Sequence, residues 1–320
     1  MTLFEQIKNV PKLDLHINLT SSISTDLAFN ITNEPILDIE DKMHEKNNRD
    51  YLDSLHLPIS ILKKKENVML CINDLITRLE NNNILYTELF LDLPLYNKRF
   101  NLDNLINDIL NVIENRNYHM NLVLCLSSKL TKEENLDILN LLDKYYLKGV
   151  SSVYFQKDKM DNLNDYDYIF SRLIKNSIPY IIDFNSKLTN NEREIYSNAS
   201  RIIYSVSEKD NDLLDIVREK NILLEFSISY LIENNVIMDI KDYLMYDLYK
   251  DNYLVTFTSR DMTTLNTDML NEECLLFNSY PISMQEFVKM NINILIHLNI
   301  DNDLKIELIN LFKEKSNDVL

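Results

Sequence analysis

Short apolar runs, rich in β-branched and aromatic residues, recur along the chain and are separated by more polar segments. Each run is short and bounded by polar or turn-forming residues, which is typical of buried strands. We therefore expect strands at residues 13–19, 86–93, 121–127, 150–156, 180–185, 201–206, 222–229 and 254–260.

The segments between these runs have a helical period. Apolar residues are spaced i, i+3, i+4 within residues 105–113, 136–146 and 213–217, for example. A strand that alternates with a helix eight times predicts an α/β fold, a parallel (β/α)8 barrel of the TIM type.

Two regions depart from this alternation. Residues 20–85 are too many for one connection and have helical periodicity of their own, so we expect an inserted helical subdomain over the mouth of the barrel. Residues 284–300 and 304–312 follow the last strand and predict two closing helices. No linker rich in Gly, Ser or Pro interrupts the chain, which favours a single domain over residues 1–320.

Composition narrows the possible functions. The chain has 33 Lys and Arg against 50 Asp and Glu, and the resulting net charge of −17 opposes binding to nucleic acid. Gly149 is the only glycine, so glycine-rich phosphate-binding loops cannot form. Asn tolerates a positive φ better than most residues, and we expect Asn-rich stretches such as 80–83 to form the turns.

The chain has no features of an exported or membrane protein. Its first residues lack the pattern of a secretory signal, and no apolar run is long enough to span a membrane. Cys71, Cys125 and Cys274 are odd in number and far apart, which favours reduced thiols. A cytoplasmic location without membrane contact is the expectation.

Polar residues gather where the predicted strands end. In a parallel barrel the loops at the carboxyl ends of the strands carry the chemistry. The residues found there are His16, Asn18, Glu88, Asp92, Tyr154, Lys157, Asp183, Ser186, Tyr204, Glu225, Ser227, Arg260 and Asp261.

The segment PKLDLHINLTSS, residues 11–22, resembles the opening strand of the adenosine and adenine deaminases, Pro-Lys-x-Glu-Leu-His-x-His-Leu-Asp-Gly-Ser. YTELFLDLP is similar to the family's Tyr-x-Glu-x-Arg-Phe-x-Pro strand, SSKLTKEENLDILNLLDKYYLKGVSSV to its third helix and fourth strand, and VTFTSRDMTTLNT to its eighth strand and following turn. The resemblance runs in register over residues 5–315 and implies an amidohydrolase barrel.

That resemblance implies hydrolytic deamination of a purine by a water molecule on zinc, which needs about four N, S or O ligands in a closed or nearly closed set. The family takes two His ligands from the first strand, one His from the fifth strand and one Asp from the eighth. These positions fall on His16, Asn18, Asp183 and Arg260, so His16 alone matches.

The other functional positions are also altered. By the resemblance, the proton-shuttling Glu falls on Ser186 and a sixth-strand His falls on Tyr204. Four positions remain of the pocket that would contact the purine nucleoside. One of them, Asp261, aligns with a base-contacting acid of the family, but we interpret it mainly as a salt-bridge residue. These remnants are Thr20, Tyr154, Lys157 and Asp261.

Arg260 decides the metal prediction. A guanidinium about 4 Å from a doubly charged ion repels it by roughly 8 kcal/mol at an effective dielectric constant near 20, which is comparable with a zinc-binding free energy. We therefore expect no zinc and no other cofactor. An ion pair between Asp183 and Arg260, with His16 and Asn18 around it, is predicted to replace the metal.

Three hypotheses follow. The first is a pseudoenzyme of the adenosine deaminase family, without zinc or catalysis, that has a binding or regulatory role and a protein partner or a second copy as its target. The second is an active purine deaminase or other hydrolase that uses an altered site. It could hold a harder cation at His16, Asp183 and Asp261, or it could work by acid and base catalysis. The third is an acidic protein-interaction module in which the barrel mouth has no role.

Overall fold

Eight strands form one parallel sheet in the order in which they occur along the chain. The structure is a computed structural model that describes residues 2–44, 51–93, 100–158 and 160–317. The strands are β1 Lys12–Asn18, β2 Ile84–Leu91, β3 Met120–Ser127, β4 Val150–Gln156, β5 Tyr180–Phe184, β6 Arg201–Tyr204, β7 Leu223–Phe226 and β8 Val255–Phe257.

The sheet closes on itself through Arg260, just beyond β8. The backbone N–H of Arg260 donates to the carbonyl of His16 at 2.8 Å, and the N–H of Asn18 donates to the carbonyl of Arg260 at 2.9 Å. This contact links β8 to β1 and confirms the predicted (β/α)8 barrel.

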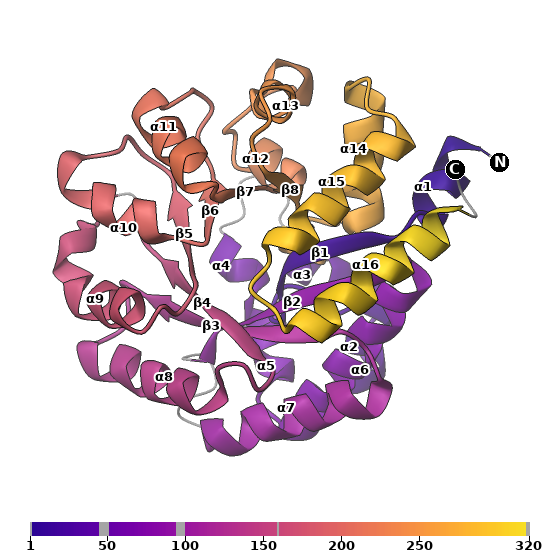
Figure 1. Ribbon diagram of the computed structural model, residues 1–320. Helices are drawn as coiled ribbons and strands as arrows, with labels where there is room; N and C mark the ends of the chain where they lie inside the picture. The colour runs from indigo at the N-terminus through magenta and orange to yellow at the C-terminus, as the bar shows by residue number, and fades with distance from the viewer. Residues whose placement is uncertain (1, 45–50, 94–99, 159, 318–320) are drawn as a thin grey trace.

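Helices surround the strands, as Figure 1 shows. Their apolar faces pack against the sheet in one continuous core. They are α1 Leu3–Asn9, α2 Thr25–Thr32, α3 Ile36–Met43, α4 Tyr51–Ser54, α5 His56–Ile61, α6 Lys65–Asn81, α7 Leu102–Arg116, α8 Lys132–Tyr145, α9 Asp167–Lys175, α10 Arg193–Asn198, α11 Asn211–Lys220, α12 Ile228–Glu233, α13 Met245–Lys250, α14 Met269–Ser279, α15 Met284–His297 and α16 Asn302–Asn317.

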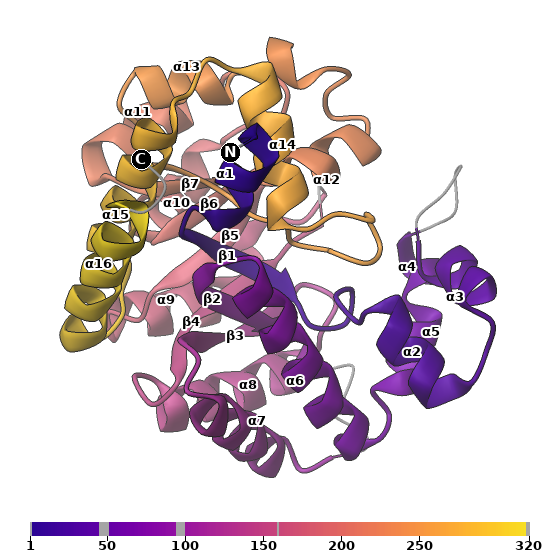
Figure 2. The same ribbon diagram turned by 90° about the vertical axis from the view of Figure 1, so that its right-hand side faces the viewer.

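The segment predicted as an insertion, 20–85, contains two kinds of helix. α6 packs against β2 and α7 and is one of the helices around the barrel. Helices α2 to α5 pack against one another and lie beside the end of the barrel toward which β1 runs (Figure 2). Residues 45–50 of this segment lie outside the described residues.

The two closing helices are present as α15 and α16. Strand β7 is shorter than the predicted 222–229, because the chain turns into α12 at Ile228. The buried carboxylate of Glu272 accepts the backbone N–H of Ile228 at 2.8 Å and so satisfies the first turn of that helix.

Asparagine replaces glycine in the turns, as the sequence predicts. Among the described residues, ten other than glycine have a positive φ, and seven of these are Asn, including Asn83 in the 80–83 turn. Asn33, Asn117 and Asn221 end helices in the left-handed conformation. Gly149, at φ 97°, lies on the turn before β4.

No helix within the described ranges has the length and apolar character needed to cross a membrane.

Candidate functional site

His16 and Asn18 leave β1 on the same face and lie at the carboxyl end of the barrel interior. His16 is fully buried. Its ring stacks on Phe90 of β2, with ring centroids 3.6 Å apart and an interplanar angle of 9°. Tyr154 of β4 meets the same ring edge-on at 5.8 Å. Aromatic side chains from neighbouring strands therefore fix the plane of the imidazole.

Both ring nitrogens of His16 face oxygen atoms. Nδ1 lies 2.5 Å from Oε1 of Glu225, and Nε2 lies 3.3 Å from Oδ1 of Asn18. The orientation of the Asn18 amide follows from its other end, because Nδ2 donates to Oδ1 of Asp261 at 2.7 Å. Both ring nitrogens of His16 are therefore engaged with neighbouring oxygen atoms, and a metal would have to displace one of these contacts.

Glu225 is the anion that holds His16 in place. Its carboxylate also lies 3.1 Å from Nε of Arg201. Arg201 reaches across the barrel and donates from Nη2 to Glu88 at 2.7 Å. Burial alone would raise the pKa of Glu225, but His16 and Arg201, with Arg260, bring it below its ordinary value.

Asp183 lies at the end of β5 and does not pair with Arg260 as predicted. Its carboxylate accepts the hydroxyl of Tyr154, and within the described ranges no ion pair joins it to the guanidinium. Burial raises the pKa of Asp183, and the charge of Arg260 opposes that rise. The charge of Arg260 therefore acts on Asp183, but the predicted direct ion pair between them does not form. Asp261 lies closer to the guanidinium and pairs with it instead.

Arg260 occupies an unusual backbone position, with φ at 55°. Its Nε lies 3.5 Å from Oδ2 of Asp261, and the guanidinium carbon lies 4.0 Å from the ring centroid of Tyr230. Burial disfavours its charged form, but Tyr230, Tyr154 and Asp183 raise the pKa of Arg260 well above its ordinary value. Nε and Nη1 have no hydrogen-bond partner among the described residues. Arg260 is therefore a buried, permanent cation whose donors are incompletely paired.

Asp261 connects the cation to β1. It accepts hydrogen bonds from the amide of Asn18 and the hydroxyl of Ser21, and it forms the ion pair with Arg260. It is 1% exposed. This is the salt-bridge geometry expected for Asp261.

The remaining predicted positions are distributed around the mouth. Thr20 is buried directly after β1. Lys157 is buried and pairs with Glu192 at 3.4 Å. The Tyr204 hydroxyl donates to the carbonyl of Glu208 and so supports the loop after β6. Ser186 lines a surface hollow beside that loop.

The structure thus joins only some of the predicted residues into one network. Its members are His16, Asn18, Tyr154, Asp183, Arg260 and Asp261, with Asp183 linked through Tyr154. Sequence reasoning missed Arg201 and noted Glu88 and Glu225 only as polar strand residues. The available signal was the charge of these three residues within otherwise apolar strands.

A metal would need ligands that this network does not offer. The described residues contain no group of three or more His, Cys, Asp or Glu arranged to hold a metal ion. Four positions would have to supply the metal ligands. Both nitrogens of His16 are engaged, the Asn18 oxygen faces His16, and the Asp183 carboxylate accepts the Tyr154 hydroxyl. At the fourth position Arg260 places a cation. Zinc does not fit the side chains as they are arranged.

Comparisons with known proteins show which sequences and structures this chain resembles. No family model matches the chain. A protein from Clostridium acetobutylicum named adenosine deaminase is 23% identical over 315 residues, which cover 89% of this chain and 92% of the relative.

Solved structures have the same fold. Arabidopsis ADAL, solved in complex with IMP, superposes with a TM-score of 0.85 at 16% identity and covers 99% of this chain and 100% of its own. An amidohydrolase from Burkholderia ambifaria, solved with bound zinc, has a TM-score of 0.78 at 11% identity and covers 100% of this chain and 95% of its own.

The chain therefore has the same (β/α)8 barrel fold as these structures. In sequence it is similar to curated proteins named adenosine deaminase over most of its length.

Proposed function

We propose that this adenosine deaminase-like protein works without zinc, does not deaminate purines, and has a binding or regulatory role. The network around His16 carries the proposal. In it a guanidinium, an amide and a doubly hydrogen-bonded imidazole lie where, by the resemblance, the family has metal ligands. Fold kinship alone does not supply activity, because function depends on the residues of the site.

The arrangement supports binding better than catalysis. Asp261, Asn18 and Glu225 are engaged with neighbouring side chains, so none of them is a free general base. A water molecule would have no metal to lower its pKa. Ser186, at the position of the family's proton-shuttling Glu, has a hydroxyl that does not shuttle protons near neutral pH. The proposed target is a protein partner or a second copy of this chain.

An altered hydrolase is the second candidate, and one observation favours it. Burial raises the pKa of Asp183, which also accepts the Tyr154 hydroxyl at the mouth. A carboxyl group with a raised pKa can act as a general acid. This candidate requires turnover without zinc, which separates it from the proposal.

Metal content and turnover test the proposal together. We expect purified protein to contain far less than one zinc per chain and to release no ammonia from adenosine, adenine or AMP. The matched variant combines Asn18→His, Asp183→His and Arg260→Asp, and it should bind about one zinc because it restores the ligand set.

The outcomes are distinct. Stoichiometric zinc with turnover in the unmodified protein would overturn the proposal. Turnover without metal would establish the altered hydrolase. If the triple variant folds and still takes no zinc, Arg260 and Asn18 are not what excludes the metal.

A further inference from the structure

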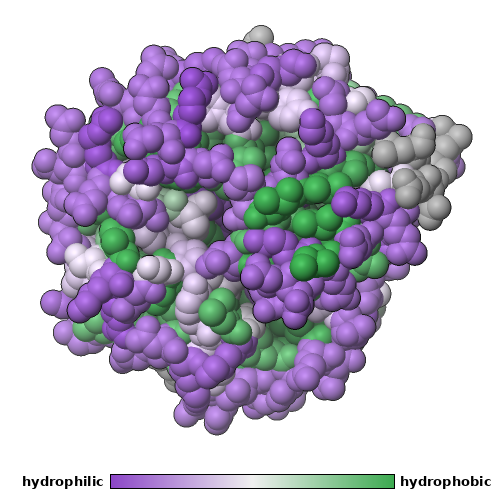
Figure 3. All heavy atoms as spheres, in the orientation of Figure 1, coloured by the Kyte–Doolittle hydropathy of each residue, from purple (hydrophilic) through white to green (hydrophobic). Residues whose placement is uncertain are grey.

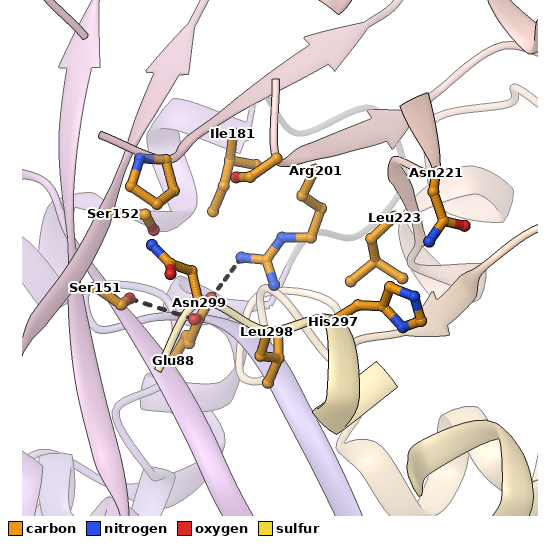
Figure 4. Close-up of a pocket in the computed structure, with 12 residues that line it drawn as sticks. Glu88, Ser151, Ser152, Ile181, Arg201, Asn221, Leu223, His297, Leu298 and Asn299 are labelled. Carbon is orange, nitrogen blue, oxygen red and sulfur yellow. Dashed lines mark hydrogen bonds and ion pairs between the residues drawn. The ribbon is translucent and has the colours of Figure 1, made fainter. Parts of the chain in front are cut away.

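A cavity of about 100 Å³ lies at the amino-terminal end of the barrel, opposite the mouth. It is bounded by the first residues of β4, β6 and β7 and is covered by the turn between α15 and α16 (Figure 4). Figure 3 shows this face of the molecule, with an apolar band over the same two helices. In many barrels this end only stabilises the fold, so an open, partly polar cavity here calls for an explanation.

Arg201 dominates the cavity wall. It is 3% exposed, its Nη2 donates to Glu88, and its Nε lies 3.1 Å from Glu225 as an ion pair without hydrogen-bond geometry. No hydrogen bond or ion pair to a described residue uses the remaining nitrogen, Nη1. In Figure 4 this outer nitrogen points away from Glu88, toward His297 and Leu298. A buried guanidinium thus presents one unused donor edge.

Ser152 supplies a second unused group. Its side chain is 4% exposed and lines the cavity, and its hydroxyl has no hydrogen-bond partner among the described residues. The neighbouring Ser151 hydroxyl, by contrast, donates to Glu88 at 3.3 Å. Buried polar groups are normally paired, so Ser152 indicates that the cavity has an occupant.

The charges select a neutral occupant. Glu88 and Glu225 already neutralise Arg201 on its two inner edges, so an anion would meet two carboxylates and a cation would meet the guanidinium. An apolar molecule would leave both donors unpaired. A carbonyl oxygen satisfies Nη1, and an N–H group satisfies the Ser152 oxygen.

Size limits the occupant further. A cavity of about 150 Å³ takes benzene, so this one takes a molecule of about four non-hydrogen atoms. We propose that the cavity at the amino-terminal end of the barrel is a binding site for a small neutral amide, whose carbonyl group accepts from Arg201 and whose N–H donates to Ser152.

The site is coupled to the barrel mouth. One nitrogen of Arg201 faces the cavity, and another lies beside Glu225. Glu225 in turn contacts His16. A ligand that draws the guanidinium toward the cavity changes the Glu225 contact. Binding at one end of the barrel therefore alters the environment of His16 at the other end, and this coupling is reciprocal.

Acetamide is the probe, and nuclear magnetic resonance titration of labelled protein is the measurement. We expect saturable shifts of the Ser152 amide and the Arg201 Nε–H, with a dissociation constant on the order of 1 mM for so small a ligand. The His16 ring signals should move with the same midpoint. Acetate, which has the same shape and a negative charge, should bind at least tenfold more weakly.

Two variants test the location. Ser152→Val removes an unpaired hydroxyl, so the protein should fold normally and bind acetamide at least tenfold more weakly. Asn299→Trp, at an exposed position on the cavity rim, should block entry. Asn211→Trp, at an exposed position at the other end of the barrel, is the matched control and should bind normally.

Three results would overturn the proposal. They are shifts that grow linearly without saturation, equal binding of acetate, and unchanged binding in both Ser152→Val and Asn299→Trp. Any of them would mean that water alone fills the cavity. Saturation without a shift at His16 would retain the site and disprove the coupling.

Discussion

Two buried arginines, one at each end of the barrel interior, are paired very differently. Arg201, at the start of β6, lies 2.7 Å from Glu88 and 3.1 Å from Glu225. Arg260, just beyond β8, lies 3.5 Å from its carboxylate partner Asp261. In the described part of the chain, Nε has no hydrogen-bond partner in either arginine. Both side chains are buried, so burial does not explain the difference.

The difference in carboxylate distances indicates that Arg201 stabilises the fold, whereas Arg260 belongs to the altered site at the barrel mouth. Arg201 lies between two buried carboxylates, pairing with Glu88 and sharing Glu225 with His16. Arg260 has a positive φ, and such local strain is concentrated at functional sites. In the resemblance to the deaminases, Arg260 is also the residue that takes a metal ligand's place. Arg260 is therefore held at a strained backbone position beside Asp261, whereas Arg201 lies closer to two carboxylates.

The largest expected effect follows from removing Arg201. In Arg201→Met, Glu88 stays buried without its cation and Glu225 loses its contact with Arg201 while keeping the one with His16, so the free energy of unfolding should fall by about 3–5 kcal/mol. Urea unfolding followed by circular dichroism measures it. The control is Arg116→Met, which removes a surface ion pair with Glu80 and should cost less than about 1 kcal/mol. Equal losses in the two variants would refute a structural role for Arg201.

A second effect at the same end depends on pH. Nζ of Lys12 donates to the carbonyls of Ile7 and Val10, at 2.8 and 2.9 Å, and lies 3.5 Å from Glu273. The carboxylate of Glu273 has no hydrogen-bond partner within the described ranges. Burial raises the pKa of Glu273 to about 8 despite Lys12. The folded state therefore keeps a proton that the unfolded chain releases near its ordinary pKa.

The sign of the pH dependence follows from that proton. Stability from protonated Glu273 is complete below the unfolded pKa and is lost as the pH rises toward 8. Glu273→Gln lacks this loss, so its stability relative to the unmodified protein should rise by about 3 kcal/mol between pH 5.5 and 8. Urea unfolding at both pH values measures the change. A constant difference between the two proteins would show that Glu273 is ionised in the fold.

The fold was predictable from the sequence because its signal is periodic. The eight strands and the two closing helices follow from alternating periods, and Asn in turns follows from its tolerance of positive φ. The early end of β7 was not predictable, because it depends on Glu272 from a distant helix reaching the backbone of Ile228. Periodicity has no information on such long-range contacts.

The members of the candidate site were predictable in part, and their pairing was not. The prediction that His16, Asn18 and Arg260 lie together was correct, because parallel strands end at the same edge of the sheet. The predicted fork between Asp183 and Arg260 was wrong, because the adjacent Asp261 lies nearer to the guanidinium. Arg201 was missed because the first residue of a strand is far from the edge where chemistry is expected.

The smallest effect should come from Arg260, and it tests the contrast between the two ends directly. In Arg260→Met, Asp261 keeps the hydrogen bonds from Asn18 and Ser21, so the free energy of unfolding should fall by only about 1–2 kcal/mol. Arg260→Asn should recover part of this loss, because Asn adopts the left-handed backbone more readily. The measurement is urea unfolding beside Arg201→Met. A loss as large as that of Arg201→Met would show that Arg260 stabilises the fold as much as Arg201 does. The proposed difference between the two arginines would then be wrong.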